Sequence, residues 1–175
     1  VGGSTILYSG HFPRFHESDF KTNSQDGVGD DWPITYDDLK PFYDLNDKMM
    51  GVAGLSGDPA YPRISNLKNP VPLGFAGEKV AKGFKKLKWH WWPSYSAVYK
   101  NKKNRYQKMS VDKNYWPKAI SNGVKLKSNC RVKKITINKA GKVNGVIYLD
   151  PKNKEKFQGA KLVILACNGV GTPRL

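Results

Sequence analysis

A chain of 175 residues with 39% hydrophobic residues is long enough to bury a core, and this composition excludes an intrinsically disordered chain. The formal net charge is +16 and it is unevenly placed: residues 1–77 hold 6 Lys or Arg against 10 Asp or Glu, whereas residues 78–175 hold 24 against 4. The longest apolar run, Leu162–Cys167, is far too short for a transmembrane helix. The basic half leaves open nucleic acid, an anionic membrane surface, an acidic partner or simply a solvated Lys-rich surface.

The chain opens with VGGST, in which two glycines precede two hydroxyl residues. A backbone with so little side-chain bulk can approach a flat or charged ligand closely and offer it N–H and O–H donors. An ordinary tight turn is the alternative. His11 and His16 have no cysteine nearby, so we predict structural loop positions rather than metal ligands. The polar residues 21–31 predict an exposed loop.

Two helices are predicted in the first hundred residues. Thr35 suits the N-cap of the first helix, Asp37 and Asp38 would lie in its first turn, and Gly51 would end it. Pro41 lies inside this helix and predicts a kink. Apolar residues repeat at helical spacing over Phe75–Leu87, with lysines around them, which predicts an amphipathic surface helix. Residues 54–72, rich in Gly and Pro, predict a connecting loop.

The second half predicts one helix followed by short strands. Ser110 is the predicted N-cap of a helix over Val111–Ile120. The strands are expected at Val124–Lys127, Arg131–Asn138, Val143–Asp150 and Glu155–Gln158. The turn 139–142 joins the middle pair as a hairpin, and imperfect alternation in the first strand of that pair predicts a bulge.

The end of the chain predicts a buried strand and the start of a helix. The uninterrupted apolar run Leu162–Cys167 is typical of a strand buried on both faces. Thr172 and Pro173 predict the N-cap and first residue of a helix. Cys130 and Cys167 lie at predicted strand ends. We therefore expect small buried residues there rather than metal ligands or a disulfide framework.

Several segments together resemble the glucose-methanol-choline (GMC) flavoprotein oxidoreductases. They are VGGST at the start, SGHFPRF at Ser9–Phe15 and DDWPITYDDLKPFYD at Asp30–Asp44. Lys161–Leu175, KLVILACNGVGTPRL, is similar to a late strand of that family and the turn after it, and Asn129–Gly145 resembles the adenine-side segment. The segments keep the family's order over nearly the whole chain. The branch they resemble most holds gluconate dehydrogenase flavoprotein subunits and pyranose oxidase.

The resemblance implies a mixed α/β fold, with a partial FAD-binding domain that contains a β-meander and a partial substrate-domain insertion. Residues 1–31 and 110–175 would belong to the FAD-binding domain, and residues 32–109 to the substrate domain and connecting helices. Neither the family's G-x-G-x-x-G fingerprint nor its catalytic His pair, or His/Asn pair, is found in this sequence. We therefore expect an internal fragment of a longer enzyme, inactive alone, without catalytic or metal-ligating residues of its own.

The resemblance assigns eight residues to FAD: Gly2, Gly3, Ser4, Thr5, Val132, Ala166, Cys167 and Asn168. The first four match the stretch beside the flavin and its diphosphate. Val132 matches the residue whose backbone meets the adenine, and the last three match the end of the late strand, close to the nucleotide. In part of the branch a histidine in V-G-G-x-x-x-H attaches to the flavin. Leu7 stands there in this chain, so FAD would be bound non-covalently.

The resemblance further implies a dehydrogenase or oxidase that transfers a hydride from a CH–OH donor, a sugar, sugar acid or alcohol, to flavin N5. It leaves the electron acceptor and the compartment open. One alternative is a basic nucleic-acid-binding module that uses aromatic residues around Trp89–Tyr106. That module would lack Arg enrichment and a known motif, so no specific nucleic acid is expected. The other is a catalytically inactive relative, since Tyr99–Tyr106 replaces a loop often rich in cysteine and glycine in this branch.

Overall fold

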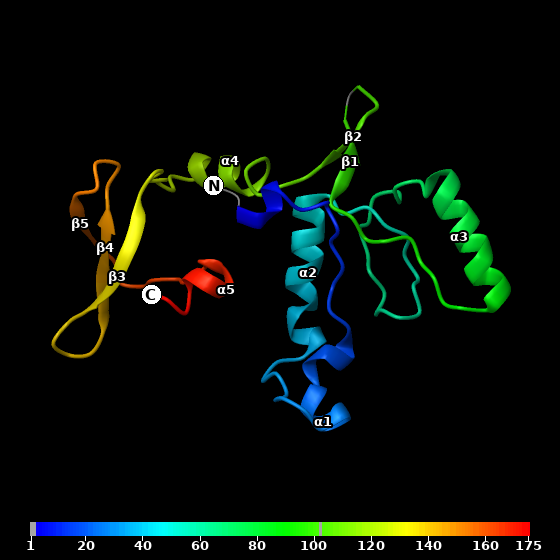
Figure 1. Ribbon diagram of the computed structural model, residues 1–175, viewed down its shortest axis with the longest axis horizontal. Helices are drawn as coiled ribbons and strands as arrows, with labels where there is room; N and C mark the ends of the chain where they lie inside the picture. Colours follow the sequence, from blue (N-terminus) through cyan, green and yellow to red (C-terminus); the bar gives the residue numbers. More distant parts are fainter. Residues whose placement is uncertain (1–2, 102) are drawn as a thin grey trace. The chain divides into compact units, whose positions relative to one another are not determined.

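The computed structural model describes residues 3–101 and 103–175, which belong to two compact units, residues 1–123 (unit 1) and residues 124–175 (unit 2). The helices of Figure 1 all lie in unit 1 except α5, and each unit has its own antiparallel sheet. The mixture of helices and sheets expected from the sequence is confirmed. The three-part division into residues 1–31, 32–109 and 110–175 stays a prediction.

Unit 1 begins with short turns rather than long elements. These are the 3-10 helices η1 (Gly3–Ile6) and η2 (Glu17–Phe20) and the helix α1 (Thr22–Asp26). The last lies inside the segment 21–31 that we expected to be a loop. Gly27 ends α1 with a φ of 73°, and the Asn23 side chain donates to the Gly29 carbonyl at 2.7 Å. The segment is largely exposed, as expected, but local hydrogen bonds organise it.

Helix α2 (Tyr36–Met50) follows the predicted start and end. The Asp38 N–H donates to Thr35 Oγ1 at 3.3 Å, and Asp38 Oδ2 accepts from the Thr35 N–H at 2.8 Å. This capping box satisfies two backbone donors of the first turn, and the Thr35 backbone N–H lowers the pKa of Asp38. Gly51 ends the helix in the left-handed region, with a φ of 63°. The helix continues past Pro41 to Met50.

The core of unit 1 is built from extended segments that are distant in sequence. Its buried side chains are Met50, Val52, Ile64, Tyr95 and Ala97. Residues 95–97 bond to residues 10–12 on one side and to Ala53 on the other, through N···O distances of 2.7–2.9 Å. Burial raises the pKa of Tyr95 to about 12, and its hydroxyl donates to the Leu55 carbonyl. These backbone hydrogen bonds join loops whose sequences show no periodic hydrophobic pattern.

The remaining elements of unit 1 agree in part with the sequence. Helix α3 (Gly74–Leu87) is confirmed. Strands β1 (Val98–Lys100) and β2 (Tyr106–Lys108) form an antiparallel hairpin where a loop was expected. Helix α4 (Tyr115–Ser121) begins four residues later than predicted. The N–H of Val111 donates to Thr5 Oγ1 at 3.2 Å and Lys113 to the Ser110 carbonyl at 3.0 Å, so Ser110 starts a turn instead.

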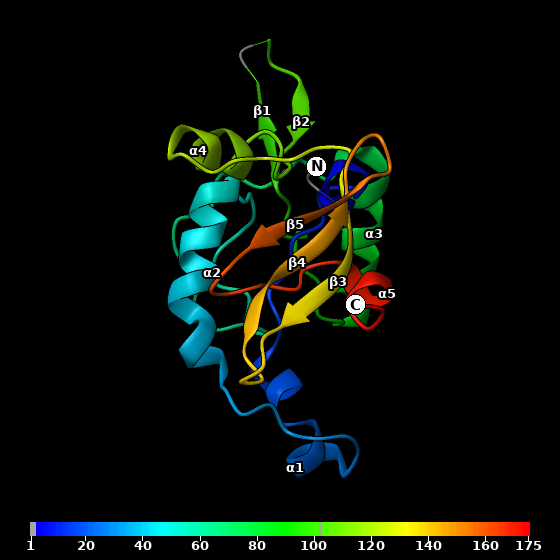
Figure 2. The same ribbon diagram turned by 90° about the vertical axis from the view of Figure 1, so that its left-hand side faces the viewer.

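Unit 2 contains an antiparallel meander of β3 (Arg131–Ile137), β4 (Val143–Leu149) and β5 (Glu155–Gly159), with β4 in the middle (Figure 2). The predicted hairpin and bulge are confirmed. Asn138 Oδ1 accepts from the N–H groups of Ala140 and Lys142, both at 3.0 Å, and the register shifts between Val132 and Lys134 and again after Thr136. These local turn bonds fix the pairing of β3 with β4.

Two predicted strands in unit 2 are wrong. Residues 124–127 and 162–167 are not strands, and in the part of unit 2 that the structure describes no strand pairs with either. Leu162 and Ile164 are therefore 77% and 80% exposed instead of buried. An apolar run becomes a strand only where a neighbouring strand satisfies its N–H and C=O groups.

The final helix also differs from the prediction. Helix α5 (Asn168–Gly171) precedes Thr172 instead of following it. The Thr172 hydroxyl accepts from the Cys167 N–H at 3.1 Å, and Asn168 Oδ1 accepts from Val170 and Gly171. The asparagine therefore uses its side chain to start the turn. Cys167 is exposed and Cys130 half-buried, so the expectation of two buried cysteines is wrong.

A buried ion pair joins the N-terminal segment to α2. Arg14 is 5% exposed and bonds to Asp47 Oδ2 through Nε at 2.9 Å and Nη2 at 2.6 Å, and to Asp44 Oδ1 at 2.7 Å. Burial alone would lower the pKa of Arg14, but its bonds to Asp44 and Asp47 outweigh burial and raise it. Burial raises the pKa of Asp47 despite this partner. Each of the two buried side chains, Arg14 and Asp47, therefore receives from the other the hydrogen bonds that water would otherwise provide.

Replacing Arg14 with methionine is expected to lower the free energy of unfolding by about 3–5 kcal/mol, because it leaves the Asp47 carboxylate buried without a cation. Urea unfolding followed by tryptophan fluorescence measures this, since all 5 tryptophans lie in unit 1. The control is Lys40→Met, which removes only the half-exposed Lys40–Asp44 pair and should cost about 0.5 kcal/mol or less. Equal effects of the two changes would contradict the assignment.

Candidate cofactor-binding site

The predicted flavin-side residues lie in and beside η1. Gly2 is outside the described residues. Gly3 has a φ of 56°, a left-handed conformation that glycine adopts without strain, and a Cβ added to it would meet no atom within 4 Å. The position therefore favours glycine through its backbone, and it leaves open space beside that backbone.

The η1 turn is held by contacts from β2 and the turn after it. Lys108 Nζ donates to the Ile6 carbonyl at 2.6 Å and to the Tyr8 carbonyl at 2.7 Å. The Tyr8 hydroxyl donates to the Met109 carbonyl at 2.6 Å, and burial raises its pKa. Thr5, one of the predicted cofactor residues, accepts from the Val111 N–H. Its hydroxyl oxygen therefore already has a structural role.

Leu7 follows η1 directly, and its side chain is 86% exposed. Its N–H donates to the Ser4 carbonyl at 3.0 Å. An aliphatic side chain provides no nucleophile for a covalent bond to a cofactor, so Leu7 offers apolar contact only.

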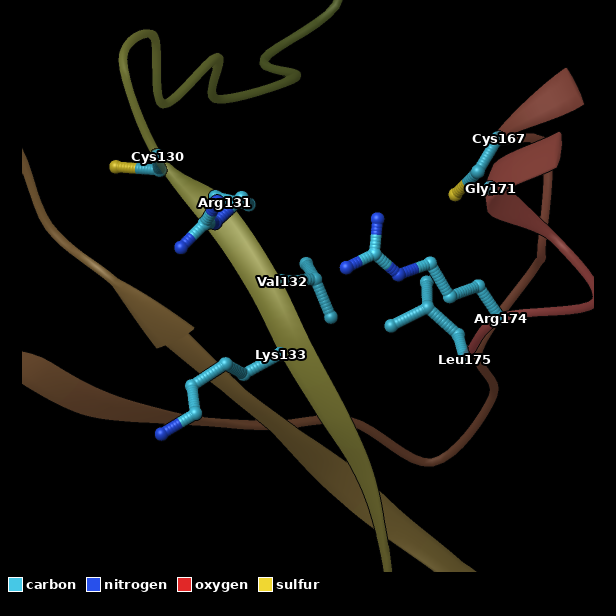
Figure 3. A pocket seen from close by; sticks show the side chains of 8 residues that line it. All are labelled: Cys130, Arg131, Val132, Lys133, Cys167, Gly171, Arg174 and Leu175. Atoms are coloured by element: carbon cyan, nitrogen blue, oxygen red, sulfur yellow. The ribbon is translucent and has the colours of Figure 1, made fainter.

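A cavity of about 520 Å³ lies in unit 2 between β3 and the C-terminal residues. It is lined by Cys130, Arg131, Val132, Lys133, Cys167, Gly171, Arg174 and Leu175. Figure 3 shows Val132 pointing from β3 toward Arg174 and Leu175, with Cys167 on the same side. Cys130 and Lys133 point away from it (Figure 3). Of the residues predicted in unit 2, the structure brings Val132 and Cys167 together at one cavity.

The turn into α5 shapes the far wall of this cavity. Asn168 has a φ of 61°, and its side chain bonds to Val170 and Gly171 at 2.9 and 3.1 Å. A Cβ on Gly171 would lie 2.9 Å from the Cys167 Cβ, so this close turn needs glycine. Ala166 and Asn168 flank Cys167 in the chain but do not line the cavity. They form the turn that presents Cys167 to it.

Both walls of the cavity combine aliphatic and cationic residues. Val132 and Leu175 are its aliphatic residues, and Arg131, Lys133 and Arg174 carry positive charge. Lys133 pairs with Glu155, whereas Arg131 and Arg174 form no ion pair within the described part of the chain. Aliphatic contact beside guanidinium groups suits a ligand that joins a flat base to a phosphate. The residues present therefore fit the adenosine diphosphate end of FAD.

The sequence missed the cationic residues of this site. It assigned none of Arg131, Lys133 and Arg174 to the nucleotide. Arg131 and Lys133 are the sequence neighbours of Val132, and Arg174 lies three positions after Gly171. Those two neighbourhoods are the signals that would have selected them.

The two histidines have structural partners, as expected. His11 Nδ1 bonds to Ser94 Oγ at 2.7 Å. His16 Nδ1 bonds to the Ala60 carbonyl at 2.8 Å and its ring stacks on Tyr61 with centroids 4.1 Å apart. Within residues 3–101 and 103–175, no group of three or more His, Cys, Asp or Glu is placed to hold a metal ion. In the same residues, no helix is long and apolar enough to cross a membrane.

Comparison with known proteins identifies relatives over the whole chain. The chain is 35% identical over 196 residues to 2-methyl-1,2-propanediol dehydrogenase of Mycolicibacterium austroafricanum, a match that covers 100% of this chain and 35% of that protein. It is 26% identical over 195 residues to the fructose dehydrogenase large subunit of Gluconobacter japonicus, covering 100% of this chain and 36% of the relative. The chain thus spans about a third of the length of these relatives.

A third relative, 6'''-hydroxyparomomycin C oxidase of Streptomyces lividus, is 37% identical over 57 residues, which is 31% of this chain and 10% of that protein. The family model described as GMC oxidoreductase matches residues 1–175. This match covers both units and agrees with the resemblance drawn from the ordered segments. The chain belongs to the GMC oxidoreductase family.

Proposed function

We propose that the full-length protein is an FAD-dependent oxidoreductase that takes a hydride from a CH–OH donor, an alcohol or a sugar. The observation that carries this proposal is the cavity of unit 2, where Val132 and Cys167, both assigned to the nucleotide from sequence, meet beside Arg131 and Arg174. The family match supports a flavoenzyme over a nucleic-acid-binding module. Reduction of the flavin by a CH–OH donor distinguishes this enzyme from an inactive relative.

The proposed roles follow from the chemistry of the residues. The backbone of Val132 and the side chain of Leu175 would hold the adenine, and Arg131 and Arg174 would neutralise the diphosphate. Gly3 and Ser4 would lie beside the flavin. When bound, FAD supplies a ring nitrogen, N5, that accepts the hydride, and the protein supplies binding, orientation and electrostatics.

The domain proposal matches these roles. Residues 1–31 and 110–175 belong to the FAD-binding domain, and residues 32–109 belong to the substrate domain and its connecting helices. The chain is then an internal part of its parent enzyme. Two of the relatives are named for 2-methyl-1,2-propanediol and for fructose, both of which carry CH–OH groups. This favours an alcohol or sugar as the substrate class.

The full-length protein is expected to purify with stoichiometric FAD that acid precipitation releases into the supernatant, because Leu7 cannot form a covalent bond to the flavin. Absorbance spectra before and after precipitation measure this. Anaerobic addition of alcohols and sugars should bleach the flavin band, and an artificial dye should then accept the electrons. The 175-residue chain alone should be colourless, since it lacks the G-x-G-x-x-G phosphate-binding turn.

Colourless full-length protein would contradict the proposed cofactor. Flavin that stays with the precipitated protein would contradict only its non-covalent attachment. Yellow full-length protein that no CH–OH donor bleaches would support the inactive relative.

Gly3→Val in the full-length protein is expected to weaken FAD binding by roughly tenfold to hundredfold, because a β-branched residue at a positive φ costs on the order of 1–3 kcal/mol and adds bulk beside the flavin. Titration of apoprotein with FAD measures the dissociation constant. Gly29→Val is the matched control, since Gly29 also has a positive φ, 66°, with no atom within 4 Å of an added Cβ. If Gly3→Val binds FAD with wild-type affinity, η1 is an ordinary turn and not part of the cofactor site.

Arg174→Met is expected to weaken FAD binding by about tenfold or more, because a charge-assisted hydrogen bond to the diphosphate contributes about 1.5–3 kcal/mol. Lys152→Met, in the exposed turn between β4 and β5, removes the same charge away from the cavity and should leave the affinity unchanged. The same titration measures both variants. Equal losses in the two would show that only the overall charge matters.

A further inference from the structure

Helix α3 is the least covered long element of unit 1. Among its 14 residues only Ala81 is buried, and Gly77 and Phe84 on the same side are half-buried. Figure 1 shows the helix joined to the rest of unit 1 through extended segments at both ends. The helix therefore contacts unit 1 along a narrow face, and unit 1 leaves the rest of its surface uncovered.

An apolar stripe lies on the uncovered surface. Ala76, Val80 and Leu87 are spaced by four and seven residues, which places them on one face of a helix. Val80 is 54% exposed and Leu87 is 59% exposed. Trp89 continues this apolar surface past the end of the helix: it is 62% exposed, and its ring lies 5.8 Å from that of Phe84.

Five lysines accompany the stripe: Lys79, Lys82, Lys85, Lys86 and Lys88. Glu78 is the acidic residue of the helix. None of the five lysines forms an ion pair within the described part of the chain. Lys79 lies over the ring of Phe75, with Nζ 5.4 Å from its centroid. The result is an uncompensated cationic band beside an exposed apolar stripe.

We propose that α3 and Trp89 bind an anionic lipid surface, with the helix lying in the membrane interface. Basic amphipathic helices bind there because apolar side chains enter the acyl boundary while lysine stems reach to anionic headgroups. A double-stranded nucleic acid would present mainly phosphates and sugars to a helix, and little apolar surface to Val80 and Leu87. A protein partner would need a groove shaped to a convex helix, whereas lipids adapt to it. The proposal does not depend on the oxidoreductase function.

Vesicle co-sedimentation of the full-length protein tests the proposal. Binding is expected to vesicles of phosphatidylcholine mixed with phosphatidylglycerol, to fall with added salt, and to be much weaker with phosphatidylcholine alone. Lys82→Gln with Lys86→Gln should weaken binding about 25-fold, since each lysine near such a surface contributes about fivefold. Lys152→Gln with Lys154→Gln is the matched control, with the same charge loss in the β4–β5 turn of unit 2, and should have no effect.

Leu87→Glu tests the apolar half of the surface and should abolish sedimentation with retained helix content by circular dichroism. Equal binding to both kinds of vesicle, or equal losses in the α3 variant and the β4–β5 control, would overturn the proposal. So would no vesicle binding at all. Retention of the protein on an acidic resin or nucleic acid without vesicle binding would assign the lysines to another anionic partner and would overturn it as well.

Discussion

The Arg14 guanidinium is the charge around which unit 1 is arranged. Removed from water, it is stable only because Asp47 and Asp44 of α2 surround it with hydrogen bonds. Tyr36, at the start of the same helix, accepts a further bond from Arg14 at 3.2 Å. The Arg14 side chain thus attaches the N-terminal segment to α2 at two places, at Tyr36 and at Asp44 with Asp47. In the same segment, residues 10–12 form backbone hydrogen bonds with residues 95–97 at 2.7–2.8 Å.

The same segment links this ion pair to the predicted flavin side. Between Arg14 and η1 the chain passes Tyr8 and Phe12, which pack against the core. Lys108 then holds the backbone of residues 6 and 8. Gly3 therefore lies at the end of a backbone that is anchored at several points. A cofactor that depends on a close backbone approach requires such anchoring, because loose donors would lose conformational entropy on binding.

The features that the sequence predicted correctly are those fixed by hydrogen bonds between residues close together in the chain. The capping box of Thr35, the stop at Gly51 and the turn after Asn138 all depend on residues within four positions of one another. The wrong predictions concern segments whose structure depends on residues distant in sequence. The apolar run 162–167 is strand-like in sequence, yet it has no neighbouring strand in the described part of unit 2. The bridges of Ala53 to Ser96 and Lys68 carry no sequence period, so no pattern could have revealed them.

The residues of the candidate site also fall into two groups, those that the sequence could assign and those that required the structure. Val132 and Cys167 were assigned through resemblance, which compares positions and needs no knowledge of folding. Arg131 and Arg174 become visible only when β3 and the residues after α5 line one cavity, since 43 positions separate them in a chain that holds 30 lysines and arginines. Among so many cations, composition cannot select two. The structure selects them because both line the cavity of unit 2 and neither forms an ion pair within the described part of the chain. Guanidinium groups that lack a carboxylate partner favour an anionic ligand.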